Sequence, residues 1–366
     1  MSMMSMAMTT NTHMEPQMRT EAAVGRRKGI AGVGLALLVW AGLVAGAWYW
    51  VQRSQEEAPM PLHHLHVEGA AQNENQAGQE EASATTTSVA AAPEVPVIPL
   101  PEDAAVPASV CAPWLQRWAA LSRTLCEQAQ LAPSGAHSVR GQPIAWRDVA
   151  PPAGQAADLR VLVVGAIHGD ELTSVVLAMH WVPMAQAAVA QDGRAVHWRF
   201  IPVLNPDGLL ARPATRTNAS GVDLNRNFPT TDWERDAPLY WEKRTRRDPR
   251  RWPGPAPLSE PESQFLHAQM QAFAPDLVVS IHAPYGVLDF DGPQTPPQKL
   301  GQLHLDRLGV FPGSLGNYGG LHLNVPVVTI ELHHALRMPA RAEINAMWRD
   351  LLAWMDKHLQ PGGGAL

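Results

Sequence analysis

Short apolar runs alternate with longer amphipathic stretches through the C-terminal part of the chain. The apolar runs, which predict strands, are residues 160–164, 198–203, 277–281 and 327–332. The amphipathic stretches, which predict helices, are residues 172–190, 259–272 and 341–358. Continuous apolar runs are typical of strands that helices cover on both faces of a sheet. The pattern therefore predicts an α/β fold with a mixed, mostly parallel central sheet and helices on both faces.

Local signals at the ends of two predicted elements agree with this pattern. Ser259 and Glu262 have the spacing of a capping box, and Pro261 between them is tolerated in the first turn of a helix. Pro326 comes just before the last predicted strand, where a missing hydrogen-bond donor is tolerated. We therefore expect a helix to begin at Ser259 and a strand to begin after Pro326.

An uncharged apolar segment near the N-terminus, residues 29–51, predicts a transmembrane helix. It exceeds the roughly 20 residues that a helix needs to cross a bilayer core. The basic run 26–28 precedes it, which places the N-terminus in the cytoplasm by the positive-inside rule. A cleavable signal peptide is the alternative, because the small residues 45–47 fit a cleavage site, and a buried core helix is another. The apolar run continues past that site, which favours an uncleaved anchor.

The composition divides the chain into four predicted parts. Residues 52–108 are rich in Ala, Glu, Gln, Thr and Pro and have almost no aromatic side chains, so they predict a disordered linker. The parts are an N-terminal cytoplasmic arm (1–28), the transmembrane anchor (29–51), the linker (52–108) and a folded domain (109–361).

The charge of the chain argues against a nucleic-acid partner. The 366 residues carry a formal net charge of −6, and no long basic stripe is present. The short basic stretch 244–251 is interrupted by Asp248 and Pro249, which is typical of a solvated loop.

The two cysteines, Cys111 and Cys126, leave the question of a disulfide open. Residues 114–129 have a helical pattern, and fifteen residues of helix would separate the cysteines by about 22 Å at about 1.5 Å per residue. A disulfide needs Cα atoms within about 7 Å of each other. A bridge therefore requires the chain to fold back between the two residues.

Residues able to bind a metal follow the predicted strands. His168 and Glu171 come three residues apart after the first strand, and His282 follows the third. Zinc accepts imidazole nitrogen and carboxylate oxygen, and a catalytic zinc site has three protein ligands and one open position. Ligands of open α/β sheets bind outside the carboxyl ends of the strands, where these residues and Asn205 and Glu331 fall. The pattern predicts a metal site at that edge.

Five motifs follow one another in a fixed order through this part of the chain. They are HGDE at 168–171, NPDG at 205–208, GVDLNRNFP at 221–229, SIH at 280–282 and EL at 331–332. The order resembles that of the zinc carboxypeptidase family, and within it most closely the bacterial murein peptide amidases. The resemblance covers roughly residues 159–332, and it implies that residues 109–361 form a zinc carboxypeptidase-like catalytic domain.

The resemblance implies one Zn²⁺ per chain, held by His168, Glu171 and His282. Asp223 aligns with the carboxylate that holds a ligating imidazole by its other nitrogen. Glu331 aligns with the general base that takes a proton from the zinc-activated water.

Three further residues align with groups that contact the substrate. Arg216 corresponds to the arginine that stabilises the oxyanion, and Asn225 and Arg226 to the pair that binds the free carboxylate of the substrate. A guanidinium binds a carboxylate with two parallel hydrogen bonds, which suits arginine to this task. The tyrosine of digestive carboxypeptidases has no counterpart at its aligned place, and neither Tyr285 nor Tyr318 is assigned to it.

The resemblance implies hydrolysis of the bond between γ-D-glutamate and meso-diaminopimelate in murein peptides. Asp289 and Asp291 are candidate partners for the distal ammonium group of diaminopimelate, with ordinary loop aspartates as the alternative. With the predicted anchor, this places a single-pass protein in the bacterial inner membrane and its catalytic domain in the periplasm. Two other functions remain open, an N-acyl amino acid amidohydrolase of the succinylglutamate desuccinylase or aspartoacylase type and an inactive wall-binding module.

Overall fold

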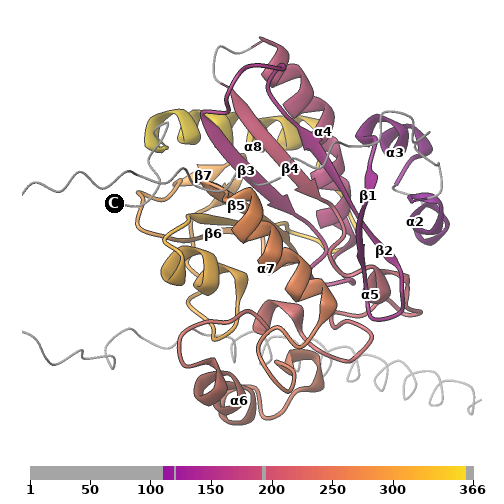
Figure 1. Ribbon diagram of the computed structural model, residues 1–366, viewed down its shortest axis with the longest axis vertical. Coiled ribbons are helices and arrows are strands. Elements are labelled where there is room, and N and C mark those ends of the chain that lie inside the picture. The colour runs from indigo at the N-terminus through magenta and orange to yellow at the C-terminus, as the bar shows by residue number, and fades with distance from the viewer. Residues whose placement is uncertain (1–109, 119–120, 192–194, 360–366) are drawn as a thin grey trace, which may run out of the picture. The chain divides into compact units, whose positions relative to one another are not determined.

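The computed structural model describes residues 110–118, 121–191 and 195–359 (Figure 1). The predicted cytoplasmic arm, anchor and linker lie outside the described residues and stay predictions. So does the domain boundary at residue 109.

A seven-stranded mixed sheet forms the centre of the fold. Its strand order is β1-β2-β4-β3-β5-β9-β6, and β4, β3, β5 and β9 run parallel to one another. The flanking strands β2 and β6 are antiparallel to their neighbours β4 and β9. The strands are β1 (Ala132–His137), β2 (Pro143–Val149), β3 (Leu159–Val164), β4 (Val196–Ile201), β5 (Leu277–His282), β6 (Val287–Asp291) and β9 (Val327–Glu331). The predicted mixed sheet is confirmed, with four neighbouring parallel strands at its centre.

Helices cover both faces of this sheet, as the apolar runs predicted. On β3, Val161 and Val163 belong to the core cluster that α4 (Leu172–Gln191) and α8 (Arg341–His358) share. The alternate residues Leu162 and Val164 point to the other face, where they pack with α7 (Pro261–Phe273). Figure 1 shows α7 on the near face and α8 behind the sheet.

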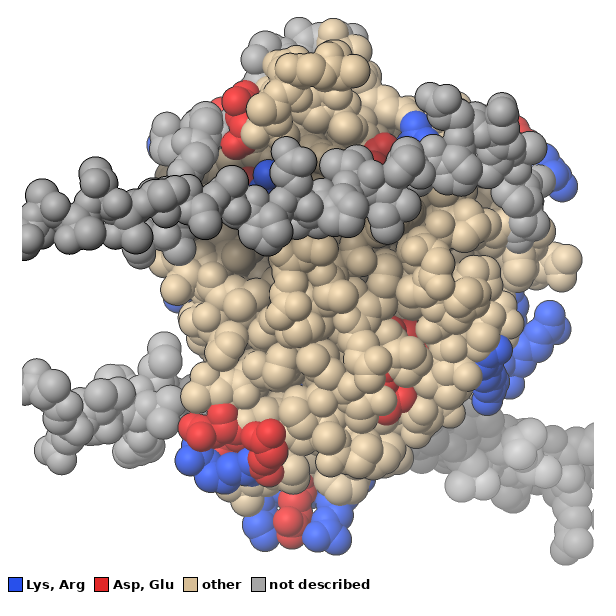
Figure 2. All heavy atoms as spheres, viewed as in Figure 1, with Lys and Arg blue, Asp and Glu red and all other residues tan. Residues whose placement is uncertain are grey.

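The remaining elements are short or lie outside the sheet. They are α2 (Ala112–Arg117), α3 (Arg123–Ala129), α5 (Pro206–Leu210), η2 (Leu224–Arg226), α6 (Trp233–Lys243), η3 (Pro249–Arg251), β7 (Lys299–Leu300), β8 (Leu303–His304) and η4 (Asn317–His322). Exposed ion pairs such as Arg235–Asp236 and Arg247–Glu242 lie on and just after α6. Figure 2 shows charged side chains gathered at the end of the molecule where α6 lies.

The predicted capping box is wrong. The N-cap of α7 is Glu260, which makes no side-chain cap hydrogen bond. The Ser259 hydroxyl donates instead to the Glu260 carboxylate at 2.8 Å, and Glu262 accepts from Asn218 at 3.1 Å. The Ser259 hydroxyl also accepts from Asn227 at 3.1 Å, so both side chains of the expected box make long-range contacts in place of the local capping bonds.

Helix α4 is apolar enough, by length and composition, to cross a membrane. Its apolar window is Leu172–Ala190, and 61% of that window is buried inside the protein. It contacts β2, β4 and β5 of the sheet, so among the described residues this helix belongs to the core.

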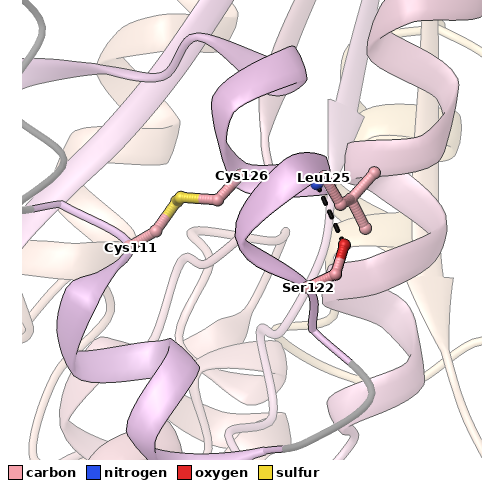
Figure 3. The surroundings of a disulfide bond; sticks show 4 residues. All are labelled: Cys111, Ser122, Leu125 and Cys126. Carbon is pink, nitrogen blue, oxygen red and sulfur yellow. Dashed lines mark hydrogen bonds between the residues drawn. A yellow bond between two sulfur atoms is a disulfide. The ribbon is translucent and has the colours of Figure 1, made fainter.

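A disulfide joins Cys111 to Cys126, which settles the question that the sequence left open (Figure 3). The expectation of one continuous helix over residues 114–129 is wrong, because α2 ends at Arg117 and α3 starts at Arg123. The Ser122 hydroxyl caps α3 by accepting from the Leu125 N–H at 3.0 Å. The chain folds back between the two helices and brings the cysteine Cα atoms to 6.2 Å.

Candidate metal centre and active site

Three side chains meet at the carboxyl edge of the sheet. His168 follows β3, Glu171 precedes α4, and His282 ends β5, and all three are buried. The Nδ1 atoms of the two histidines lie 3.2 Å apart. Glu171 reaches both rings, with Oε1 at 2.7 Å from His168 Nδ1 and Oε2 at 2.9 Å from His282 Nδ1. The three predicted zinc ligands thus lie within 4.8 Å of one another.

The donor set and its spacing fit a zinc ion. Ligand atoms at about 2.0–2.1 Å from a tetrahedral zinc lie about 3.3 Å from each other, close to the 3.2 Å between the two imidazole nitrogens. The outer nitrogen of His168 contacts Asp223 Oδ1 at 3.1 Å, and that of His282 contacts Ser280 Oγ at 3.0 Å. Such outer partners orient a metal-binding imidazole. The prediction for Asp223 agrees with this contact, while the role of Ser280 was not predicted.

The electrostatics of the cluster favour the protonation state that metal binding requires at Glu171 and at His282. At His168, burial and the charge of Arg216 lower the pKa, but the carboxylates of Glu171 and Asp223 outweigh them and raise it. Burial disfavours the charged form of Glu171, but the imidazoles of His168 and His282 outweigh it and hold the pKa of Glu171 well below its usual range. Burial lowers the pKa of His282. Glu171 is therefore ionised and His282 neutral near neutral pH, as ligands must be.

Glu331 stands beside the cluster on the neighbouring strand. It pairs with His282 in the register of β5 and β9, and the Leu332 N–H donates to the His282 carbonyl at 2.8 Å. Its Oε2 atom is buried and has no hydrogen-bond partner among the described residues. Burial, together with the charge of Glu171, raises the pKa of Glu331 well above its usual range. A carboxylate with a raised pKa binds a proton more readily, which suits a group that accepts a proton and passes it on.

Arg216 lies against the metal cluster, held by two carboxylates. Its Nε donates to Asp223 Oδ2 at 3.0 Å, and its Nη1 lies 3.7 Å from Glu171 Oε1. The side chain of Asn205 donates to the backbone carbonyl of Arg216 at 3.2 Å. The NPDG motif therefore helps to position this arginine, which was predicted to stabilise an oxyanion.

A second feature of the NPDG motif is a close backbone approach to the HGDE motif. A side chain on Gly169 would collide with the backbone of Gly208, so this contact requires glycine at position 169. The Asn205 Oδ1 atom accepts from the Gly208 N–H at 2.8 Å and caps the short helix α5. The two motifs form one packed unit under the metal cluster.

Arg226 is a buried guanidinium with an unused donor. Its Nη1 donates to the Asn225 carbonyl at 2.7 Å, and its Cζ lies 4.5 Å from the centre of the Phe311 ring. Its Nε has no hydrogen-bond partner among the described residues, and burial lowers the pKa of the group. The Asn225 side chain accepts from the Leu315 N–H at 2.8 Å. A buried cation with a free donor favours an anionic ligand.

Asp289 and Asp291 lie on β6 and differ in their surroundings. Glu331 pairs with Val287, so Asp289 lies two residues further on the same face of the sheet. Asp289 is buried and accepts from the Phe290 N–H at 2.9 Å. Asp291 lies against η4, where a side chain on Gly316 would collide with its carboxylate. Burial and the charge of Asp289 raise the pKa of Asp291 to about 7.

The two tyrosines also differ in their positions. Tyr318 is buried and stacks on Phe228 with ring centres 5.9 Å apart, so it is part of the core. Tyr285 is 40% exposed and follows His282 by three residues. Its backbone N–H hydrogen bonds to the carboxylate of Glu331, the predicted base; this contact was not predicted, and it helps to fix that side chain.

Comparison with known proteins gives concordant matches. A family model described as zinc carboxypeptidase matches residues 115–295. Murein peptide amidase A of Escherichia coli (strain K12) is 30% identical over 247 residues, which span 65% of this chain and 97% of that protein. The protein of the same name from Vibrio campbellii is 30% identical over 202 residues, 53% of this chain and 76% of that protein. The crystal structure of murein-tripeptide amidase from Escherichia coli O157 matches with a TM-score of 0.41 and 25% identity, over 62% of this chain and 96% of that chain.

Proposed function

The chain belongs to the zinc carboxypeptidase family, and we propose that this hydrolase cleaves the amide bond between γ-D-glutamate and meso-diaminopimelate in murein peptides. The observation that carries the proposal is the convergence of His168, Glu171 and His282 with Glu331 beside them. The names of the two bacterial relatives support murein peptides as the substrate class.

The residues around the cluster have distinct tasks in this proposal. A bound zinc ion would polarise the scissile carbonyl and lower the pKa of a water molecule. Glu331 accepts the proton of the attacking water and passes it to the leaving amine, which its raised pKa favours. Arg216, fixed by Asp223, donates to the carbonyl oxygen as negative charge develops there.

The leaving group of this reaction carries an α-carboxylate and a distal ammonium group. Arg226, with its unpaired Nε, is the proposed partner of the α-carboxylate, together with Asn225. Asp289 is the better placed of the two candidate partners for the ammonium group, because it lies two residues along β6 from the position that pairs with Glu331, and Asp291 lies four residues from it. Asp291, which lies against the start of η4, would be a second carboxylate for the ammonium group.

The apolar segment 29–51 supports a membrane tether for this activity. A single-pass anchor in the bacterial inner membrane, followed by the long linker 52–108, would allow a periplasmic domain to reach peptides of the cell wall. Fractionation of cells that express the full chain, with protease accessibility of the domain in spheroplasts, tests this location.

The activity is tested with the full chain in detergent micelles. The protein is incubated with L-Ala-γ-D-Glu-meso-diaminopimelate and, separately, with N-acyl amino acids, and products are identified by mass spectrometry. Release of diaminopimelate that chelation abolishes is the expected result. Cleavage of N-acyl amino acids alone would identify an amidohydrolase of the desuccinylase type instead. Stoichiometric zinc without turnover of either substrate would indicate a wall-binding module.

A further inference from the structure

A cavity with two tryptophans lies next to the metal cluster. It has a volume of about 420 Å³ and is lined by Thr215, Arg216, Thr217, Trp241, Arg250 and Trp252, among others. Its walls come from the loop between α5 and η2 on one side, and from α6 and the η3 turn on the other. A volume in this range is that of a ligand pocket rather than of a packing defect.

Three contacts connect this cavity to the proposed catalytic groups. Arg216 lines the cavity and reaches Asp223 at 3.0 Å. The Asp223 N–H donates to the Trp252 carbonyl at 2.8 Å. Arg250 binds Asp170, which lies between two of the proposed metal ligands in the sequence, at 2.9 Å. Arg216, which lines the cavity and binds Asp223, thus links the cavity wall to the metal cluster.

The position of Arg216 determines which part of the substrate would enter the cavity. In the proposed reaction, Arg226 binds the carboxylate of the leaving group, and Arg216 donates to the scissile carbonyl. The cavity lies on Arg216 rather than on Arg226. It would therefore receive the part of the substrate that carries the scissile carbonyl, which is the acyl side.

In a murein peptide, few chemical groups on the acyl side of this bond could occupy the cavity. It contains the γ-linked D-glutamate, then L-alanine, and then the N-acetylmuramyl sugar of the glycan strand. The methyl group of L-alanine cannot fill a cavity of about 420 Å³. Two residues of extended chain reach about 7 Å, so the sugar lies well beyond the scissile bond, on the acyl side where Arg216 and the cavity lie.

The lining fits a neutral sugar ring beside a carboxylate. The Trp241 indole N–H donates to the Asp248 carbonyl at 2.7 Å, which fixes the orientation of a ring that lines the cavity. Aromatic faces carry partial negative charge and attract the C–H face of a saturated ring. None of the lining residues is acidic, and Arg216 and Arg250 are cations. The free α-carboxylate of γ-linked D-glutamate matches these cations, whereas a cationic ligand does not.

We propose that this cavity binds the N-acetylmuramyl group, so that the preferred substrates are peptides still attached to muramic acid. The inference rests on the proposed amidase function. It predicts a preference for N-acetylmuramyl-L-Ala-γ-D-Glu-diaminopimelate over the free tripeptide of at least about tenfold in kcat/KM, the size that one or two stacking contacts provide.

The test compares both substrates on the full chain in micelles and measures the released diaminopimelate. In Trp252→Ala the ratio of kcat/KM for the muramyl peptide to that for the free tripeptide should fall about tenfold. The Trp252 carbonyl that binds Asp223 belongs to the backbone and stays in this variant. The matched control is Trp118→Ala, at the end of α2 and not among the residues that line the cavity, which should leave the ratio unchanged.

The other outcomes distinguish failure of the muramyl site from failure of the amidase function. Equal kcat/KM values for the two substrates in the wild-type protein, or an unchanged ratio in Trp252→Ala, would overturn the muramyl site and leave the amidase function standing. Turnover of neither substrate would overturn the amidase function itself. If Trp252→Ala does not fold, the muramyl site is tested by inhibition of the wild-type protein with two product analogues. N-acetylmuramyl-L-Ala-D-Glu should inhibit at least about tenfold more strongly than L-Ala-D-Glu, and equal inhibition overturns the site.

Discussion

Glu331 lies directly beside His282, because the two residues are paired across the parallel strands β5 and β9. The proposed base is thus placed against a proposed zinc ligand by backbone hydrogen bonds rather than by a flexible loop. Since side chains alternate between the two faces of a strand, a shift of β9 by one residue would turn Glu331 away from the cluster.

Replacement of Glu331 by glutamine should abolish proton transfer and preserve the metal site. We expect kcat to fall by about 10²–10⁴-fold, the usual contribution of a positioned acid–base group. Zinc content, measured by mass spectrometry of the metal, should equal that of the wild-type protein. A residual kcat within tenfold of the wild type would assign the proton transfer to another group.

Ser280→Ala should weaken zinc binding without removing a ligand. The hydroxyl of Ser280 contacts His282 Nε2 at 3.0 Å, and loss of such an outer partner costs about 10–100-fold in metal affinity. Competition with a fluorescent chelator measures the affinity. Ser134→Ala, which removes a hydroxyl bonded to the Ile144 carbonyl on β2, is the matched control and should bind zinc normally.

Arg226→Gln should impair substrates that have a free carboxylate. Loss of a hydrogen bond to a charged group costs about 1.5–3 kcal/mol, so we expect kcat/KM to fall by about 10–100-fold, mainly through KM. For a substrate that is amidated at this carboxylate, kcat/KM should fall far less in the variant. Arg235→Gln, on the exposed surface of α6, is the control and should behave as the wild type. An equal loss for both substrates would contradict carboxylate binding by Arg226.

Asp148 should stabilise the fold except in acid. It pairs with Arg199 across β2 and β4 through two contacts of 2.7 Å. Burial raises the pKa of Asp148, but the hydrogen bonds from Arg199 and His197 outweigh it and hold the pKa below its usual value. This stability is therefore present above about pH 4, the unfolded pKa, and is lost as the pH falls through the folded pKa.

The experiment is thermal unfolding of the wild type and of Asp148→Asn from pH 7 to pH 3. The variant should be less stable by about 1–2 kcal/mol at pH 7, and the difference should shrink below about pH 4. A difference that stays constant to pH 3 would show that the charge of Asp148 does not contribute.

Cys111→Ser combined with Cys126→Ser should destabilise the region before β1. A bridge that closes a loop of this length, with a separation of 15 residues, stabilises a protein by about 3 kcal/mol in the chain-entropy description. We expect hydrogen exchange to rise over α2 and α3, with the exchange of β5 and β9 unchanged. Uniform loss of protection through the sheet would mean that the bridge supports the whole fold.

The sequence predicted those parts of the fold and site that depend on local patterns. The strands at 160–164 and 277–281 are continuous apolar runs, and they correspond to the buried strands β3 and β5. The candidate metal ligands were identified because they follow such runs, and the structure brings them together. The spacing of the motifs also gave the zinc carboxypeptidase family, which the comparisons confirm.

The parts that were missed depend on contacts between distant residues. Strand β1 has only half-buried and exposed positions and contains Pro133 and Gly135, so its pattern is weak. The break between α2 and α3 accompanies the disulfide, which the helical periodicity of residues 114–129 does not reveal. The tryptophan cavity joins residues 215–221 to residues 241–252. No short-range pattern indicates that these two loops meet.

Asp223 receives contacts from both His168 and Arg216 through its two oxygens. One carboxylate thereby connects a proposed metal ligand to the proposed donor for the developing negative charge. A change that displaces the Asp223 carboxylate would remove the partner of the imidazole and of the guanidinium together, so an engineered variant without Asp223 would need a new anchor for each of them.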